Sequence, residues 1–184
     1  LNKMKLNIEM KKPKLRKKVP KMKIDLFKSM ISPILLYGSE VWVFCKADPI
    51  ERFYLSFLKQ VLCVKKATPN CFVYGELGVY PMFIERRVRM FKFWIKIISS
   101  KENTIMKQMY YELIACNIMY PDIKTWVSLF KDMLCKYGLG YIWDNQFSTN
   151  PVVFENEFKQ RVYDVYLQEW RAEVEATSNL RLYK

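Results

Sequence analysis

The chain has 184 residues and a formal net charge of +13; 51% of its residues are hydrophobic and 16% are aromatic. This length suits one domain with a sizeable core, and this composition excludes a disordered chain. Only five glycines are present, and the turn pairs Asn-Gly and Asp-Gly are absent, which argues against strands and hairpins. We therefore expect a mainly α fold, an irregular bundle of six or seven helices with no significant sheet.

Positive charge is concentrated at the N-terminus. Residues 1–28 contain eleven Lys or Arg but only two acidic residues, Glu9 and Asp25. A basic excess indicates an anionic partner, with nucleic acid first and an acidic membrane surface second, although a solvated tail has the same composition. Residues 1–20 are predicted to be a basic arm that is poorly ordered or weakly helical, and residues 21–184 a single helical domain.

Cysteine and histidine usage limits the chemistry of the chain. Its five cysteines are never spaced Cys-x-x-Cys and it has no histidine, which argues against a zinc site and favours free thiols in a reducing compartment. The charged N-terminus does not resemble a signal peptide, and no apolar stretch is long enough to span a membrane. We therefore expect an intracellular protein of the cytoplasm or nucleus.

The first strong helical pattern starts near Lys21. Pro33 is expected to bend this helix, and Gly38 beyond the bend to let a neighbouring backbone come close. Because its polar residues are few, we expect the helix to be buried on most of its surface and to form the centre of the fold. Its apolar residues recur at three- and four-residue spacing: Ile24, Phe27, Ile31, Ile34 and Leu35.

Two further helices are predicted from proline-containing start signals. Asp48-Pro49 supplies a capping carboxylate followed by proline at the first helical position. Lys65-Lys66 places positive charge at the negative end of that helix. Thr68-Pro69 repeats the start signal for a short helix, and Gly78 is a plausible C-terminal cap.

The clearest amphipathic helix follows Pro81. One face is apolar and consists of Ile84, Val88, Phe91, Ile95 and Ile98, widened by Trp94. The opposite face gathers Arg89, Lys92 and Lys96, with Glu85 beside them and Arg86 and Phe93 at its edge. Such a basic face suits a phosphate backbone, with aromatic rings available to stack. An ordinary solvated helix face has the same pattern.

The remaining chain predicts three more helices, over residues 103–116, 123–137 and 151–176. Tyr120-Pro121 separates the first two, Gly138 ends the second, and residues 138–143 are expected to form a loop. The last helix carries two apolar stripes, which suggests that it packs against more than one partner. The stripes consist of Phe158, Val162 and Val165, and of Tyr163, Leu167, Trp170 and Val174.

Groups for catalysis are missing from the sequence. Without histidine, the usual general base and every Ser-His or Cys-His nucleophile are excluded. No glycine-rich phosphate loop is present, and the aspartates are scattered. The closest acidic group is Glu155 with Glu157, but it lies at a helix N-terminus, where carboxylates offset the helix dipole. We expect no enzyme activity in this chain as it stands, and no cofactor.

Two strings resemble the reverse transcriptases of non-LTR (LINE-type) retrotransposons. Residues 32–42, Ser-Pro-Ile-Leu-Leu-Tyr-Gly-Ser-Glu-Val-Trp, look like the segment just after the palm, where Pro-x-Leu-x-Tyr-Gly-x-Glu-x-Trp is typical. Residues 75–81 and 89–94 are similar to the continuation of that segment. The resemblance covers roughly residues 24–184 and implies the thumb and post-thumb region, with residues 21–100 thumb-like and 101–184 adding further helices.

In that family, paired aspartates in an upstream palm hold the magnesium ions of the polymerase, and this chain contains no Ala-Asp-Asp string. The resemblance therefore implies a non-catalytic role: to hold the template–primer or element RNA, as RNA or an RNA–DNA hybrid, against a palm that this sequence lacks. The nucleic-acid-binding residues predicted on this basis are Arg86, Arg89, Lys92, Lys96, Lys65 and Lys66.

Two other classes of function fit the same sequence. A helical scaffold could dock a protein partner through exposed aromatic residues, because the chain has twelve Tyr, twelve Phe and five Trp. A weaker option is a peripheral membrane binder that uses the N-terminal basic arm.

Overall fold

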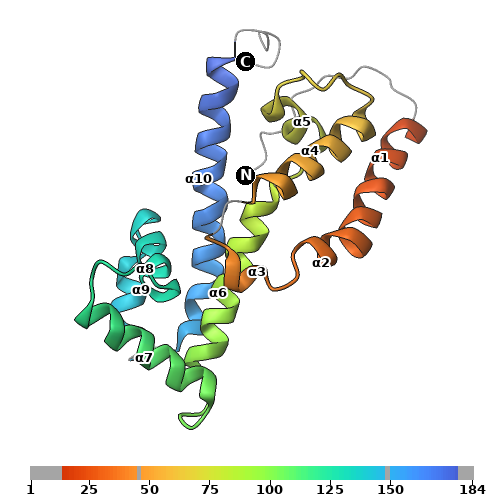
Figure 1. The fold of residues 1–184 in the computed structure, drawn as a ribbon. Coiled ribbons are helices and arrows are strands. Elements are labelled where there is room, and N and C mark those ends of the chain that lie inside the picture. The colour runs from red at the N-terminus through yellow and green to blue at the C-terminus, as the bar shows by residue number, and fades with distance from the viewer. Residues whose placement is uncertain (1–13, 45–46, 148–149, 178–184) are drawn as a thin grey trace.

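The computed structural model describes residues 14–44, 47–147 and 150–177, and these residues form helices and no strand (Figure 1). The expected mainly α fold is confirmed. The elements are α1 (Lys14–Leu26), the π-helical turn η1 (Phe27–Ile31), α2 (Ser32–Leu35), α3 (Ser39–Trp42), α4 (Asp48–Leu62), α5 (Asn70–Leu77), α6 (Met82–Ile98), α7 (Ile105–Met119), α8 (Trp126–Lys136), α9 (Gly140–Asp144), the 3₁₀ turn η2 (Pro151–Phe154) and α10 (Glu155–Ala176). Of the predicted basic arm, residues 1–13 lie outside the described residues.

Helices α6 and α10 are the long axis of the molecule. They run side by side in opposite directions, and the other helices pack around them (Figure 1). Both carry the apolar periodicity that the sequence predicts, and the predicted end of α10 at Ala176 is confirmed. The centre of the fold is therefore α6, which contacts α3, α4, α7 and α10.

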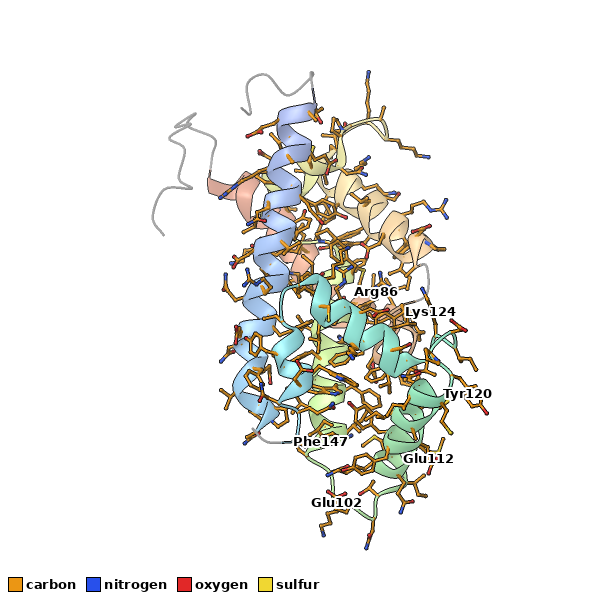
Figure 2. All side chains as sticks on the ribbon, turned by 90° about the vertical axis from the view of Figure 1, so that its left-hand side faces the viewer. Arg86, Glu102, Glu112, Tyr120, Lys124 and Phe147 are labelled. Carbon is orange, nitrogen blue, oxygen red and sulfur yellow. The ribbon has the colours of Figure 1, made fainter. Side chains whose placement is uncertain are left out.

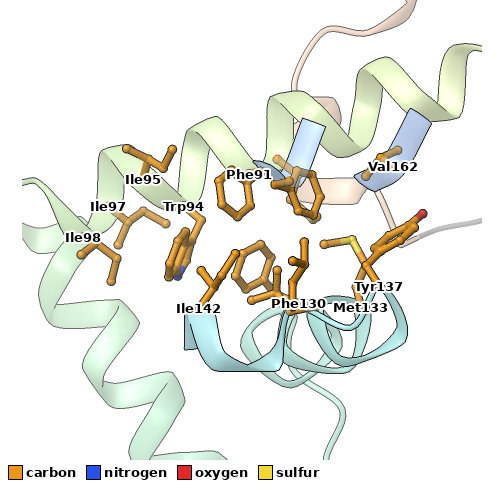
Figure 3. Packing of buried hydrophobic residues seen from close by; sticks show 14 of the residues in the cluster. Phe91, Trp94, Ile95, Ile97, Ile98, Phe130, Met133, Tyr137, Ile142 and Val162 are labelled. Carbon is orange, nitrogen blue, oxygen red and sulfur yellow. The ribbon is translucent and has the colours of Figure 1, made fainter. Parts of the chain in front are cut away.

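A large aromatic core surrounds the C-terminal half of α6 (Figure 3). The rings of Phe91 and Phe158 stack with centroids 4.2 Å apart and planes only 5° from parallel. Trp94 lies against Phe130, with ring centroids 5.0 Å apart. These fully buried rings join α6 to α8 and α10, and burying rings of this size is a major source of stability.

A second core lies at the other end of α6. It joins α1 and η1 to α4, α5 and the first turn of α6. Phe27 lies at its middle, stacked on Phe57 at 4.5 Å between ring centroids and packed against Tyr54 at 5.1 Å. Met82 belongs to this second core and Ile84 to the first, so the boundary between the two cores falls within α6 itself.

Two tryptophan side chains join segments that are distant in sequence. The Trp126 indole N–H donates to the Glu40 carbonyl at 3.0 Å, which links α8 to α3. The Trp170 indole N–H donates to the Cys71 carbonyl at 2.8 Å, which links α10 to α5. Helix α10 thus extends past the first core and reaches the second. For this reason it needs a second apolar stripe.

The expectation of a buried central helix in the segment after Lys21 is wrong. The segment stays helical through α1, η1 and α2, with a π-helical turn just before Pro33, and then leaves the helix after Leu35, where Gly38 turns the chain with φ +64° before α3. Ile24 and Phe27 are buried as expected, but Ile34 is 75% exposed. A Cβ on Gly38 would lie no closer than 3.8 Å to Trp42, so the positive φ, and not close packing, accounts for this glycine.

Several predicted helix ends are shifted. Helix α1 begins at Lys14 and includes Pro20, whereas a start near Lys21 was expected. Asp48 and Thr68 cap no helix: the N-caps are Ala47 and Pro69, and neither makes a side-chain capping bond. The expected loop 138–143 contains the short helix α9. Gly78 and Gly138 do follow helix ends with φ +62° and +70°.

Candidate nucleic-acid interface

One face of α6 carries charged residues that are exposed or half-buried. Glu85, Arg89, Lys92 and Lys96 follow one another at steps of four, three and four residues, which places them on one face of the helix. Trp94 and Phe91 lie on the opposite face, in the core. The predicted division of α6 into an apolar face and a basic face is therefore present for these residues.

Arg86 does not belong to that exposed face, which corrects the sequence-based prediction. Its side chain is only 7% exposed, and Nη2 lies 3.4 Å from Oε1 of Glu51. Its guanidinium also lies over the Trp42 ring, 5.6 Å from the ring centroid. Figure 2 shows Arg86 inside the packed side chains. Helices α3 and α4 cover this edge of α6, so Arg86 is unavailable to a phosphate.

Glu51 is the partner that holds Arg86 in place. Oε2 of Glu51 accepts the backbone N–H of Met82 at 3.1 Å, at the start of α6. Burial raises the pKa of the Glu51 carboxyl, and the Met82 hydrogen bond and the charge of Arg86 oppose this rise. Within the described residues, Nε and Nη1 of Arg86 have no hydrogen-bond partner. This ion pair is a structural feature of the α4–α6 contact.

Arg89 is half-buried and paired within its own helix. Nη2 and Nε lie 2.7 Å and 3.1 Å from Oε1 of Glu85, and Nη1 approaches the Leu36 carbonyl at 3.5 Å. A carboxylate therefore already neutralises this guanidinium. Its contact with Leu36 places Arg89 beside the turn between α2 and α3.

Lys92 and Lys96 are the exposed cations of the face. The ammonium group of Lys92 lies 3.2 Å from Oε1 of Glu155, the first residue of α10. Lys96 forms no ion pair with any residue that the structure describes. Exposed pairs of this kind contribute only about 0–1 kcal/mol, so Lys92 can exchange Glu155 for a phosphate at little cost.

Lys65 and Lys66 are not brought to the α6 face. Both are exposed in the turn after α4, whereas the opposite end of α4 contacts α6 through Glu51. Their turn is closed by the Lys59 ammonium, which donates to the Lys66 carbonyl at 2.7 Å. The structure thus separates the six predicted residues. One of them, Arg86, is buried, three lie along α6, and two lie at a distant turn.

Two lysines that the sequence analysis missed lie beside α6. Lys28 of η1 and Lys159 of α10 line a cleft beside α6. Glu85 and Val88 of α6 line this cleft too. We call Lys28, Arg89, Lys92, Lys96 and Lys159 the basic surface. Lys159 follows Glu155 by one helical turn, a spacing visible in the sequence, but Lys28 could be found only from the tertiary contacts of η1.

The described residues offer no visible centre for metal chemistry and no membrane span. No three Cys, Asp or Glu side chains gather in them as a metal site would require. Within the same residues, each helix is too short or too polar to cross a bilayer. The chemistry available to the basic surface is the binding of anions by lysine ammonium groups.

Comparisons with protein-family models, with curated proteins and with solved structures find no match to this chain.

Proposed function

We propose that this chain is a non-catalytic, nucleic-acid-binding helical region of a LINE-type reverse transcriptase, one that holds an RNA–DNA hybrid or element RNA through its phosphates. The observation that carries the proposal is the gathering of cations from η1, α6 and α10 along one side of α6. Five cations lie there with two carboxylates, Glu85 and Glu155, so the surface keeps a positive charge. The family is proposed from the resemblance of residues 32–42, 75–81 and 89–94.

Backbone binding fits this surface better than the reading of bases. Lysine side chains are flexible point charges that suit phosphates without specifying sequence. Arg89 is the one arginine of the basic surface, and its guanidinium is already hydrogen-bonded to Glu85. We therefore expect affinity that depends strongly on salt and little on sequence.

Charge reversal on α6 tests the proposal. The double variant Lys92→Glu/Lys96→Glu should weaken binding of a fluorescently labelled RNA–DNA hybrid by about tenfold or more at low salt, as measured by anisotropy. The matched control is Lys124→Glu/Lys136→Glu, which reverses two exposed lysines that flank α8, on the opposite, apolar side of α6. Equal weakening by both variants would show that only the net charge matters and would reject this site.

A second candidate, protein docking, is favoured by a separate observation. The segment 32–42, which carries the resemblance, exposes large apolar side chains: Ile34 is 75%, Tyr37 86% and Val41 62% exposed. Several large exposed apolar side chains in one short segment are typical of protein contacts. The variant Ile34→Ser/Tyr37→Ser should leave nucleic-acid affinity unchanged and should reduce self-association in sedimentation velocity. Weaker nucleic-acid binding by this variant would instead assign the segment to the nucleic-acid interface.

A further inference from the structure

A cleft of about 250 Å³ opens beside the N-terminal half of α6. Its walls come from four parts of the chain, namely η1 with the start of α2, α4, residues 80–88 and α10. These elements surround the upper part of α6 in Figure 1. Small-molecule sites usually have volumes of about 300–1,000 Å³. At about 250 Å³ the cleft lies just below this range, so it can hold one flat group such as a single base but not a larger ligand.

One part of the cleft is aromatic. Phe27, Tyr54, Tyr80 and Tyr163 line it. The rings of Tyr80 and Tyr163 are 4.6 Å apart between centroids and meet at 82°, so their faces point in different directions. Tyr80 is an exposed residue of the lining, whereas Phe27 and Tyr54 are buried. Tyr80 also meets Tyr166 edge to face, with ring centroids 5.7 Å apart. At 39% exposed, Tyr80 is the ring of this wall that is most accessible to a flat aromatic ligand.

The other part of the cleft is cationic. Lys28 and Lys159 approach it from η1 and α10, and neither forms an ion pair with a carboxylate of the described residues. The acid in the lining, Glu85, is already paired with Arg89 at 2.7 Å. Two lysines are therefore available to an anionic group next to the aromatic wall.

From this combination we infer that the cleft binds one unpaired nucleotide of a bound strand. The base lies against Tyr80, and the adjoining phosphate lies near Lys28 and Lys159. Stacking on an aromatic side chain is open to every base because each has a π face, whereas a paired base has none free. The inference rests on the proposed function and adds to it a preference for strands that carry an unpaired nucleotide.

The test compares two RNA–DNA hybrids that differ only by one bulged nucleotide. The full chain should bind the bulged hybrid about tenfold more tightly than the fully paired one. Tyr80→Ala should abolish this preference while the affinity for the paired hybrid is retained, because Tyr80 lies outside the basic surface. Tyr80→Phe keeps the ring and should keep the preference, which controls for loss of packing against Tyr163.

Each other result contradicts the inference in a distinct way. Equal affinity of the wild-type chain for both hybrids would reject the nucleotide cleft but leave the proposed function standing. Binding of neither hybrid would reject both. A preference that survives in Tyr80→Ala would place the unpaired nucleotide elsewhere. Displacement of the bulged hybrid by equimolar adenosine monophosphate would assign the cleft to a free nucleotide and not to a strand.

Discussion

At the scale of single residues, Glu51 and Arg86 have a structural role that is not evident from their charges alone. Glu51 accepts the first backbone N–H of α6 and pairs with the buried Arg86. Removing one partner of a buried pair leaves the other charge without compensation, which costs about 3–5 kcal/mol. Hence Arg86, which the sequence suggests for binding, belongs to the stability of the fold.

We therefore predict that Glu51→Ala lowers the free energy of unfolding by about 3 kcal/mol in urea denaturation. The matched control is Asp48→Ala, which removes an exposed carboxylate from the first turn of the same helix, where no side-chain capping bond is made. The control should cost less than about 1 kcal/mol. Similar losses in the two variants would mean that the pair with Arg86 contributes nothing.

Glu155 is the residue that limits the charge of the basic surface. Glu155→Gln should raise affinity for the RNA–DNA hybrid about threefold, because Lys92 then has no competing carboxylate. Glu157→Gln is its control, since Glu157 lies in the same first turn of α10 but accepts a hydrogen bond from Tyr141. An unchanged affinity of Glu155→Gln in the anisotropy assay would show that Lys92 does not contact phosphate.

At the scale of elements, the stacked rings of α6 and α10 account for the packing of the first core. Phe91→Ala should lower the free energy of unfolding by about 3–5 kcal/mol, because a fully buried ring leaves a cavity. Phe53→Ala removes the same ring from an exposed position on α4 and should cost about 1 kcal/mol or less. Urea denaturation of both variants measures the difference, and equal losses would contradict this account of the core.

Helix periodicity made α6 and α10 predictable from the sequence, while the segment 21–42 was not. In α6 and α10 the apolar spacing continues over several turns and no proline interrupts it. In the segment after Lys21, the same spacing continues to Leu35, but Ile34 is exposed although it lies within a helix. Apolar spacing predicts which residues share a face of a helix, but it does not show whether another element covers that face.

The candidate site was predictable only in part, because the sequence does not show which neighbouring elements cover a helix. A helical wheel places Arg89, Lys92 and Lys96 on one face, and they do lie there. The same wheel cannot say which flank of that face a neighbouring helix covers, and α3 and α4 cover the flank of Arg86. Lys28 needed the tertiary structure, because no local pattern links η1 to α6.

At the scale of the whole molecule, buried tyrosines predict alkaline unfolding. Burial, with the charges of Glu51 and Glu85, raises the pKa of Tyr54 to about 12. Burial likewise raises the pKa values of Tyr74, Tyr110 and Tyr166. In the unfolded chain tyrosine ionises near pH 10, so above that pH the unfolded state loses protons that the fold retains.

Stability should therefore fall as pH rises from about 10 towards 12, by about 1.4 kcal/mol per pH unit for each of the buried Tyr54, Tyr74 and Tyr110, and by less for the half-buried Tyr166. The part of the tyrosinate absorbance that comes from the buried rings should appear only together with the loss of helical circular dichroism. Ionisation of all twelve tyrosines with the helical signal intact would contradict the burial of these side chains.

The salt dependence of binding tests the central claim most directly. If several lysines of the basic surface contact phosphates, the logarithm of the association constant for an RNA–DNA hybrid should fall linearly with the logarithm of salt concentration, with a slope of about −3 to −4. The variant Lys92→Glu/Lys96→Glu should flatten this slope by about two. A wild-type slope near zero, or a slope that the variant leaves unchanged, would contradict the assignment of this surface to nucleic acid.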